Sequence, residues 1–559
     1  MSNPNLFYLV AIEAAHIQDY IFNSNRLREN IGASYLVAAV TDTWAREEFA
    51  KIEKSISNEK RIEFNTQQKA EVLYAGGGNF VGIFRTDRDV KAFTKALTQR
   101  VLFEAPGLHI IAHSISYEWA DHKDNPSLAS AIKQLLSELK KQRNQQPANI
   151  GLSGLGVTAM CDSTSLPAVT MIEDQDKVAR IYSAESVAKR AFASDANGML
   201  AKFIDLDNRF CYPFDFDDLG RTEGEKSYIA VVHADGNGIG KLVTTISNHY
   251  NTIAQNRAYI EALHTLSDKI KSASNAALKA VVDTLQSQIK DGIFTGLHDQ
   301  ADLTLKKDGN HFIFPFRPLV FGGDDVTFVC DGRIGIALAV EFVRQFELET
   351  KNLQIADNLP IKNLTMCAGI AITKVHYPFA RAYDLAEKLC QSAKALVRDP
   401  KGEMPTHSAI DWHFTAGGLY GTLEAIRARE YKVSMPKTSL TLRPVFIDGT
   451  AHAYRTWQHI ERVTTAFQWG DWRDSRNKAK ALTTILRQGQ DAVKAYKTRY
   501  LEGTKLSLPS SPYFEEDGWH ELEEADSKTF FCGYFDALEL MDLHIPFSSS
   551  LSLAEEAHG

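Results

Sequence analysis

The stretch Phe321–Phe328 reads FGGDDVTF and decides the fold expected for this chain. Apolar, β-type residues flank Gly322–Asp325, so these four residues are expected to form the tip of a β-hairpin. Glycines there permit positive φ and let a ligand approach the main chain closely. Two adjacent carboxylates repel each other, and a hard cation bound through oxygen is the usual compensation. A solvated Asp-Asp turn is the plain alternative.

A second run, His233–Lys241 (HADGNGIGK), follows the strand-like segment SYIAVVHA. Asp235 lies where that strand is expected to end, and the next helix opens with three glycines, Gly236, Gly238 and Gly240. Amide groups in a glycine-rich turn at a helix N-terminus suit a polyphosphate. The alternative is an ordinary strand-to-helix turn with an N-capping aspartate.

The order of predicted elements places both runs in one fold. Residues 226–414 alternate strands and helices around the hairpin in the order of a ferredoxin-like sandwich. Residues 1–125 repeat that order, β-α-α-β-β-α-β, with little identity between the two. We therefore expect an α+β protein with two ferredoxin-like units that arose by internal duplication.

In a ferredoxin-like sheet the first strand lies beside the central hairpin, so Asp235 and the hairpin acids Asp324 and Asp325 are expected to meet. With the main chain of Gly236 they would hold two divalent cations, Mg²⁺ or Mn²⁺. Two such ions ~3.5–4 Å apart can clamp the attacking and leaving oxygens of a phosphoryl transfer. Asp325 could instead hold the turn.

Further residues are candidates for contacting the nucleotide. Gly322 and Gly323 at the hairpin tip would let it approach the backbone. Lys394, in LAEKLCQSAKALVR, lies near the end of a predicted helix and could reach a γ-phosphate as a point charge. A solvated helical lysine is the alternative reading of Lys394.

The first unit lacks these acids. Its hairpin, VLYAGGGNFVGIF, keeps a glycine turn, Gly76, Gly77 and Gly78, followed by Asn79. Two interpretations stay open at this point: a purely structural half, or a platform for an acceptor nucleotide facing the second unit.

The remaining segments give broader expectations. Residues 126–225 suggest a mainly helical connector and residues 415–559 a mainly helical C-terminal domain. The 559 residues carry a formal charge of −8, which argues against a chain wholly devoted to coating nucleic acid. A basic stretch in the last segment is either a solvated face or a contact for RNA or protein. It comprises Arg473, Arg476, Lys478, Lys480, Arg487, Lys494, Lys497 and Arg499.

Several functional classes are not expected. None of the six cysteines forms a CxxC pair, so the spacing predicts no zinc ribbon. The dipeptide His298–Asp299 stands alone in a polar insert, whereas HD phosphohydrolases need several converging ligands. The start has no signal-peptide pattern and no window is apolar enough to span a membrane, so we expect a cytoplasmic protein.

These motifs together resemble the large, polymerase-like subunit of type III CRISPR effector complexes, the Cas10 family. FGGDD with the upstream DGNGIG is similar to the second palm domain of that family, and AGIAITKVHYPFARAYDLAEKLCQSAK to its closing strand and helix. IEAAHIQDYIFNSNRLRENIGAS and LYAGGGNF resemble its first palm. The resemblance covers most of the chain.

The resemblance implies an enzyme that makes cyclic oligoadenylates from ATP in antiviral defence, when its complex binds foreign RNA. Asp235, Asp324 and Asp325 match the metal-binding carboxylates, and Lys394 a helix lysine near phosphate. Three features depart from the family. No HD nuclease domain precedes the first palm and no cysteine finger appears in the connector. Asn237 stands where many members carry a second aspartate. A reduced family member without DNA cleavage is therefore expected.

Two other functions fit parts of the sequence. A dinucleotide cyclase such as a diguanylate cyclase usually has GG(D/E)EF in a single palm, which two fused units and Asp325 argue against. A non-catalytic scaffold that binds RNA and neighbouring effector subunits would not need Asp235, Asp324 and Asp325 together.

Overall fold

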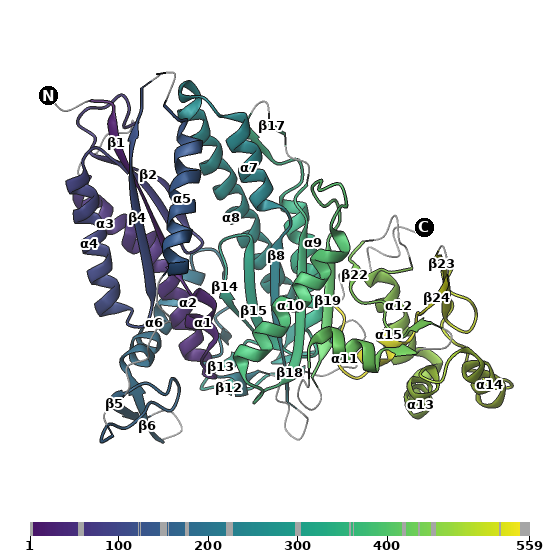
Figure 1. The fold of residues 1–559 in the computed structure, drawn as a ribbon. Coiled ribbons are helices and arrows are strands. Elements are labelled where there is room, and N and C mark those ends of the chain that lie inside the picture. The colour runs from purple at the N-terminus through teal and green to yellow at the C-terminus, as the bar shows by residue number, and fades with distance from the viewer. Residues whose placement is uncertain are drawn as a thin grey trace.

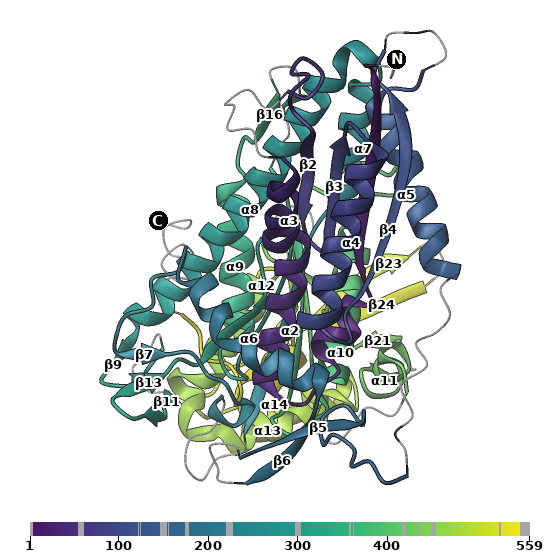
Figure 2. The ribbon, with the colours of Figure 1, turned by 90° about the vertical axis from the view of Figure 1, so that its left-hand side faces the viewer.

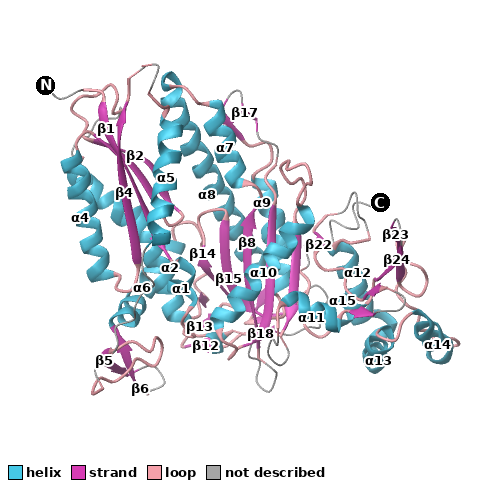
Figure 3. Cartoon of the chain, in the orientation of Figure 1, coloured by secondary structure: helices cyan, strands magenta, loops and turns pink. Residues whose placement is uncertain are grey.

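The computed structural model is an α+β protein, as predicted, with two large sheets side by side and a smaller C-terminal part (Figures 1 and 3). The structure describes residues 4–547 apart from 54–60, 121, 123–124, 146–153, 155, 174–177, 220–226, 297–302, 357–358, 361–362, 416–420, 434–436, 449–453 and 525–526. His298–Asp299 thus lies outside the described residues.

The first sheet has the strand order β2-β3-β1-β4, and all of its pairings are antiparallel. Its strands are β1 (Leu6–Ala15), β2 (Ala70–Gly76), β3 (Asn79–Phe84) and β4 (His109–Glu118). Between them run α1 (Ile17–Phe22), α2 (Leu27–Ala39), the π-helical turn η1 (Val40–Trp44), α3 (Ala45–Ile52) and α4 (Asp87–Glu104). This order is the ferredoxin-like arrangement expected from the sequence.

The second sheet contains the same four-strand order, β14-β15-β8-β18, and continues through β19 and β22. Its strands are β8 (Tyr228–Gly236), β14 (Phe316–Val320), β15 (Asp325–Asp331), β18 (Met366–Lys374), β19 (Ala409–Phe414) and β22 (Val445–Phe446). The matching order agrees with a duplication. Strand β22 extends the sheet beyond residue 414, because Val445 and Phe446 pair with β19.

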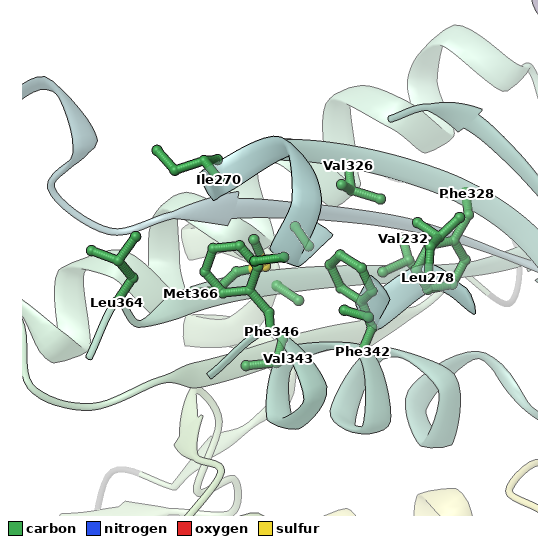
Figure 4. Close-up of a cluster of buried hydrophobic side chains, with 14 of the residues drawn as sticks. Val232, Ile270, Leu278, Val326, Phe328, Phe342, Val343, Phe346, Leu364 and Met366 are labelled. Atoms are coloured by element: carbon green, nitrogen blue, oxygen red, sulfur yellow. The ribbon is translucent and has the colours of Figure 1, made fainter. Parts of the chain in front are cut away.

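Helices cover both faces of the second sheet because its strands are apolar on both sides. α8 (Asn256–Ser287) and α9 (Gly335–Glu349) pack on one face, and α10 (Phe379–Val397) on the other, while α7 (Ile239–His249) follows β8. Figure 4 shows the α8/α9 side, where Val232, Val326 and Phe328 point into a buried cluster with Phe342 and Phe346. Residues at alternate positions, such as Val231 and Val329, belong to the core under α10.

Two helices fill the space between the sheets. α5 (Leu128–Gln145) and α8 contact the first sheet as well as each other (Figures 1 and 2). Arg257 of α8 pairs with Glu63 and Glu71, and its Nη1 lies 2.6 Å from Glu71 Oε1. His264 Nε2 lies 2.8 Å from the carbonyl oxygen of Leu73. The second unit therefore grips strand β2 of the first.

The connecting segment contains a hairpin as well as the expected helices. β5 (Ala168–Glu173) and β6 (Ala179–Ser183) precede α6 (Ala184–Leu200), which packs on α2. Short elements lie around the second unit: β7 (Phe210–Cys211), η2 (Phe216–Asp218), η3 (Ile253–Gln255), β9 (Ile289–Lys290), β10 (Ile293–Phe294), β11 (Leu303–Thr304), β12 (Lys307–Asp308), β13 (His311–Ile313), β16 (Gln354–Ala356) and β17 (Leu359–Pro360).

The C-terminal part combines helices with a four-stranded sheet of order β20-β21-β24-β23. Its elements are α11 (Leu423–Glu430), β20 (Lys432–Val433), β21 (Thr438–Ser439), α12 (Trp457–Gln468), η4 (Gly470–Ser475), α13 (Arg476–Leu486), α14 (Gln490–Tyr500), β23 (Trp519–Glu524), β24 (Ser527–Cys532) and α15 (Phe535–Leu540). Sequence patterns predicted the helices, whereas β23 and β24 went unrecognised. No described helix is long and apolar enough to cross a bilayer.

Candidate active site

The end of β8 and the start of β15 place two acids opposite each other. Asp325 and Asp235 are direct partners in the antiparallel ladder, and the amide of Gly236 donates to the carbonyl oxygen of Asp324 at 3.1 Å. The hairpin tip requires glycine at Gly322, whose φ is 91°. Three acids from distant parts of the sequence thus meet at one sheet edge, as predicted from the ferredoxin-like order.

The next cross-strand pair on the same face supports Asp325. His233 lies opposite Thr327, two residues before the acid pair, so all four side chains point to the α10 side. His233 Nδ1 lies 3.3 Å from Asp325 Oδ1 and 3.2 Å from Thr327 Oγ1. Burial lowers the pKa of His233 to about 4, more than the charge of Asp235 can raise it, so its imidazole is neutral at pH 7.

Lys394 reaches the same carboxylates from α10. Its Nζ lies 2.5 Å from Asp235 Oδ2 and donates to the carbonyl oxygen of Gly236 at 3.3 Å. The helix can lie this close to the sheet because residue 369 is glycine. A Cβ at Gly369 would lie 2.0 Å from the carbonyl oxygen of Ala386 in α10. The sequence placed Lys394 near phosphate, but not in an ion pair with Asp235.

The carboxylates crowd one another. Loss of solvating water is the largest cause that raises the pKa of Asp324, followed by repulsion from Asp235. The same two causes, with Asp324 added, raise the pKa of Asp325 to about 7, although half of the Asp325 side chain remains accessible. Asp235 raises the pKa of Lys394 against the effect of burial. The acids therefore lack enough positive charge around them, and an added cation would relieve that.

A cleft of about 670 Å³ opens beside these acids. Six of the predicted residues line it: Asp235, Gly236, Gly238, Gly240, Asp324 and Lys394. Three further lining residues, Lys241, Thr244 and Thr245, lie on the first turns of α7 and were missed. Their spacing, i, i+3 and i+4, puts them on one helix face and was the available signal. Lys241 Nζ donates to the carbonyl oxygens of Gly402 at 3.0 Å and Glu403 at 3.3 Å.

Other predicted residues lie outside this cleft. The hairpin glycines Gly322 and Gly323 do not line it, and neither do Gly76, Gly77 and Gly78 of the first unit. All three first-unit glycines have positive φ, and a Cβ at Gly78 would meet Ile17 at 2.4 Å. This tight packing favours the structural reading for Gly78 and leaves the platform reading for Gly76 and Gly77 as a prediction.

Asn237 serves the fold. Its amide donates to the carbonyl oxygen of Thr365 at 2.8 Å, and its side chain to Thr365 Oγ1 at 3.0 Å. These bonds tie the glycine-rich turn to the chain just before β18. The buried Asn237 side chain therefore faces away from the acids.

Much of the predicted basic stretch is engaged within the protein. Arg476 and Lys480 pair with Asp542, and Lys497 Nζ lies 3.1 Å from Glu516 Oε2. The residues also fall on two helices, α13 and α14, with η4 before them. A shared RNA-binding face remains a prediction.

The donor set fits divalent cations in chemistry, because it consists of carboxylate and carbonyl oxygens. Yet among the described residues no group of three His, Cys, Asp or Glu side chains is already gathered as a metal site. The ammonium group of Lys394 holds Asp235, while Asp325 turns toward His233. Asp235, Gly236, Asp324 and Asp325 could therefore hold a cation once Lys394 releases Asp235.

Comparisons with known proteins agree with this geometry. The model of the family described as Cas10/Cmr2, second palm domain, matches residues 228–400, which contain Asp235, the GGDD hairpin and Lys394. This match confirms the resemblance drawn from the sequence: the chain is a Cas10-type palm protein. No curated protein is similar enough to count as a relative.

Solved structures share the fold at low identity. A chain of the Csm1–Csm4 cassette in complex with pppApApA has 13% identity and a TM-score of 0.53, and the match covers 96% of this chain and 69% of that chain. A cassette in complex with cA4 gives 12% and 0.42, with 70% and 53% covered. Csm1 from T. onnurineus gives 15% and 0.42, with 70% and 52% covered. This chain spans about half the length of the first Csm1-type chains that it matches.

Proposed function

We propose that this chain, whose residues 228–400 form a Cas10/Cmr2-type second palm domain, converts ATP into cyclic oligoadenylates by nucleotidyl transfer. The observation that carries the proposal is the direct cross-strand pairing of Asp235 with Asp325, next to Asp324 and a polar cleft. Three acids that raise one another's pKa are costly to a fold, and cation-assisted phosphoryl transfer gives them a use.

The proposed reaction is an in-line displacement at phosphorus. A ribose 2′- or 3′-hydroxyl of one nucleotide attacks the α-phosphorus of another, a new P–O bond forms, and the bond to the β-phosphate oxygen breaks. Pyrophosphate leaves and the hydroxyl proton passes to solvent. Repetition lengthens the chain, and attack by its own terminal hydroxyl closes the ring.

Residues of this chain would position the reactants. The helix N-terminus at Gly238–Gly240 presents main-chain amides to the cleft, and Lys394 and Lys241 place positive charge on two sides of it. Thr244 and Thr245 add hydroxyl groups to the wall along α7. When Lys394 leaves Asp235 for a phosphate oxygen, the carboxylate becomes available as a ligand.

We further propose that Asp235, Asp324, Asp325 and the carbonyl group of Gly236 hold two Mg²⁺ or Mn²⁺ ions. Such ions, when bound, would neutralise the triphosphate and lower the pKa of the attacking hydroxyl. The raised pKa values of Asp324 and Asp325 support this assignment, because a cation would offset the repulsion.

ATP as substrate is supported by the resemblance and by the titles of the structures with the same fold, which name pppApApA and one ATP as ligands of Csm1–Csm4 cassettes. An RNA activator, neighbouring CRISPR effector subunits, a cytoplasmic location and a role in antiviral defence follow from the same resemblance and are part of this proposal. So is the division into two palm units (1–125, 226–414), a connector and a C-terminal domain.

The test is product analysis by mass spectrometry after incubation with ATP, GTP, CTP or UTP and Mn²⁺, with and without RNA. We expect oligoadenylates from the parent and none from Asp324→Ala/Asp325→Ala, whereas Asp268→Ala, which removes an exposed acid on α8, should match the parent. Product from the double variant equal to the parent would end the proposal. Strict GTP use would favour a dinucleotide cyclase, and protein partners without any turnover would favour a scaffold.

A further inference from the structure

We propose that Gln18 and Tyr383 are positioning residues through which the first ferredoxin-like unit holds the carboxylate of Asp325. The inference rests on the proposed function of the second unit and gives a role to the first unit, whose own Glu13 is paired with Arg143 at 2.5 Å. The connection runs from Gln18 in α1 to Tyr383 in α10, then to His233 in β8 and to Asp325 in β15.

The connection starts at Asp325. His233 is the side chain with a ring nitrogen beside this carboxylate, 3.3 Å away, and Thr327 occupies the same nitrogen at 3.2 Å. Because Asp325 begins its strand and half of its side chain is accessible, little else in the described structure fixes its rotamer. The position of the His233 ring therefore decides where the Asp325 carboxylate points.

The His233 ring is in turn packed by Tyr383. The two rings meet edge to face, with centroids 5.5 Å apart and an interplanar angle of 77°. Tyr383 is buried, so its ring leaves the imidazole little space to rotate. Tyr383 also lies near enough to Asp325 for the carboxylate to contribute to the raised pKa of its phenol.

Two residues of the first unit hold Tyr383. Phe22 stacks on its ring with centroids 3.8 Å apart and planes 23° apart, and Gln18 Nε2 donates to its hydroxyl at 3.2 Å. Both come from the six-residue helix α1 (Figure 1). Asn25, just after α1, accepts a hydrogen bond from the amide of Phe379 at 2.8 Å. The first unit thus grips the N-terminal half of α10 at two places.

The same helix holds the partner acid. Lys394, three turns beyond Tyr383, carries the ion pair with Asp235. The two carboxylates that face each other across β8 and β15 are therefore both held from α10, and α10 is docked on the first unit. A shift of the first unit relative to the second would move Tyr383, and through His233 it would change the direction of Asp325.

The test compares Gln18→Leu, Tyr383→Phe and the double variant with the parent. The matched control is Tyr377→Phe, a half-buried tyrosine just before α10 that contacts neither His233 nor Asp325 in the structure described. Two quantities are measured: the Mn²⁺ concentration that gives half-maximal ATP turnover, and Mn²⁺ binding without nucleotide, from the electron paramagnetic resonance signal of the free ion.

We expect each single variant to need about fivefold more Mn²⁺ in both measurements, the effect of one lost hydrogen bond. The double variant should need no more than either single one, because both substitutions remove the same bond. KM for ATP should change less than the Mn²⁺ requirement, and Tyr377→Phe should match the parent. Since Gln18 is exposed, Gln18→Leu leaves the core intact even if Tyr383→Phe unfolds the chain.

The outcomes separate this inference from the proposed function. Variants that turn over ATP and bind Mn²⁺ like the parent overturn the positioning role and leave the function standing, and so does a double variant whose effect is the product of two independent ones. A parent that binds Mn²⁺ more tightly than the variants yet makes no oligonucleotide supports the positioning role and overturns the function. A parent that binds no Mn²⁺ overturns both.

Discussion

Lys394 Nζ lies 2.5 Å from Asp235 Oδ2, so the lysine expected to meet phosphate is held by the acid expected to meet a metal ion. Both groups are only partly exposed, and the two charges compensate each other in the free protein. Binding of a nucleotide with its cations would exchange this pair for two new ones, lysine with phosphate and carboxylate with metal. The ion pair is thus a placeholder that keeps the site ordered before substrate arrives.

Replacing Lys394 tests this exchange. We expect Lys394→Met to lower kcat/KM for ATP by about 100-fold, because one charge-assisted contact to phosphate, worth about 3 kcal/mol, disappears. Lys388→Met, which removes an exposed lysine from the same helix, should behave like the parent. Steady-state kinetics with Mn²⁺ give the comparison, and equal values for the two variants would remove Lys394 from the site.

Removing one carboxylate should make the metal-free protein more stable. Asp325 is repelled by Asp235 and Asp324, so we expect Asp325→Asn to raise the melting temperature in EDTA by about 2 °C. Asp268→Asn, on an exposed face of α8, should leave it unchanged. In excess Mn²⁺ the parent should gain stability and Asp325→Asn should gain less. A variant that melts below the parent in EDTA would contradict mutual repulsion.

Gly369 permits the close approach of α10 to β18. We expect Gly369→Ala to destabilise the protein by about 2–4 kcal/mol, because the new Cβ would overlap the carbonyl oxygen of Ala386. Gly198→Ala, in helix α6 with open space around it, should be neutral or slightly stabilising. Thermal unfolding of both variants checks the pair, and equal melting temperatures would show that α10 can move away without cost.

A buried histidine should make the C-terminal part sensitive to acid. Burial, the largest cause, lowers the pKa of His459 to about 4, with Arg462 lowering it further and the carbonyl group of Gly533 opposing both. An unfolded histidine titrates near pH ~6.5. Between these values the unfolded chain binds more protons than the folded one, so stability falls as the pH drops from 6.5 to 4.

Substitution by glutamine would remove that dependence. We expect His459→Gln to lose less stability than the parent between pH 7 and 5, by on the order of 1–2 kcal/mol. His376→Gln, at an exposed position, should show the same pH dependence as the parent. Melting temperatures measured across this pH range decide the matter; parallel curves for the parent and His459→Gln would assign the acid sensitivity elsewhere.

The sequence by itself determined the two ferredoxin-like orders and the acids of the second unit. Alternating apolar strands, glycine-rich turns and helical spacing are local properties, so they are legible along the chain, and the fold they specify forces Asp235 next to the GGDD hairpin. Only the tertiary structure decided what surrounds those acids. The ion pair of Lys394, the contact of His233 with Asp325 and the grip of Gln18 on Tyr383 join residues 94 to 365 positions apart. They depend on how closely α10 packs on the sheet and the first unit on α10, which is a matter of side-chain volume in three dimensions and leaves no periodic trace in the sequence.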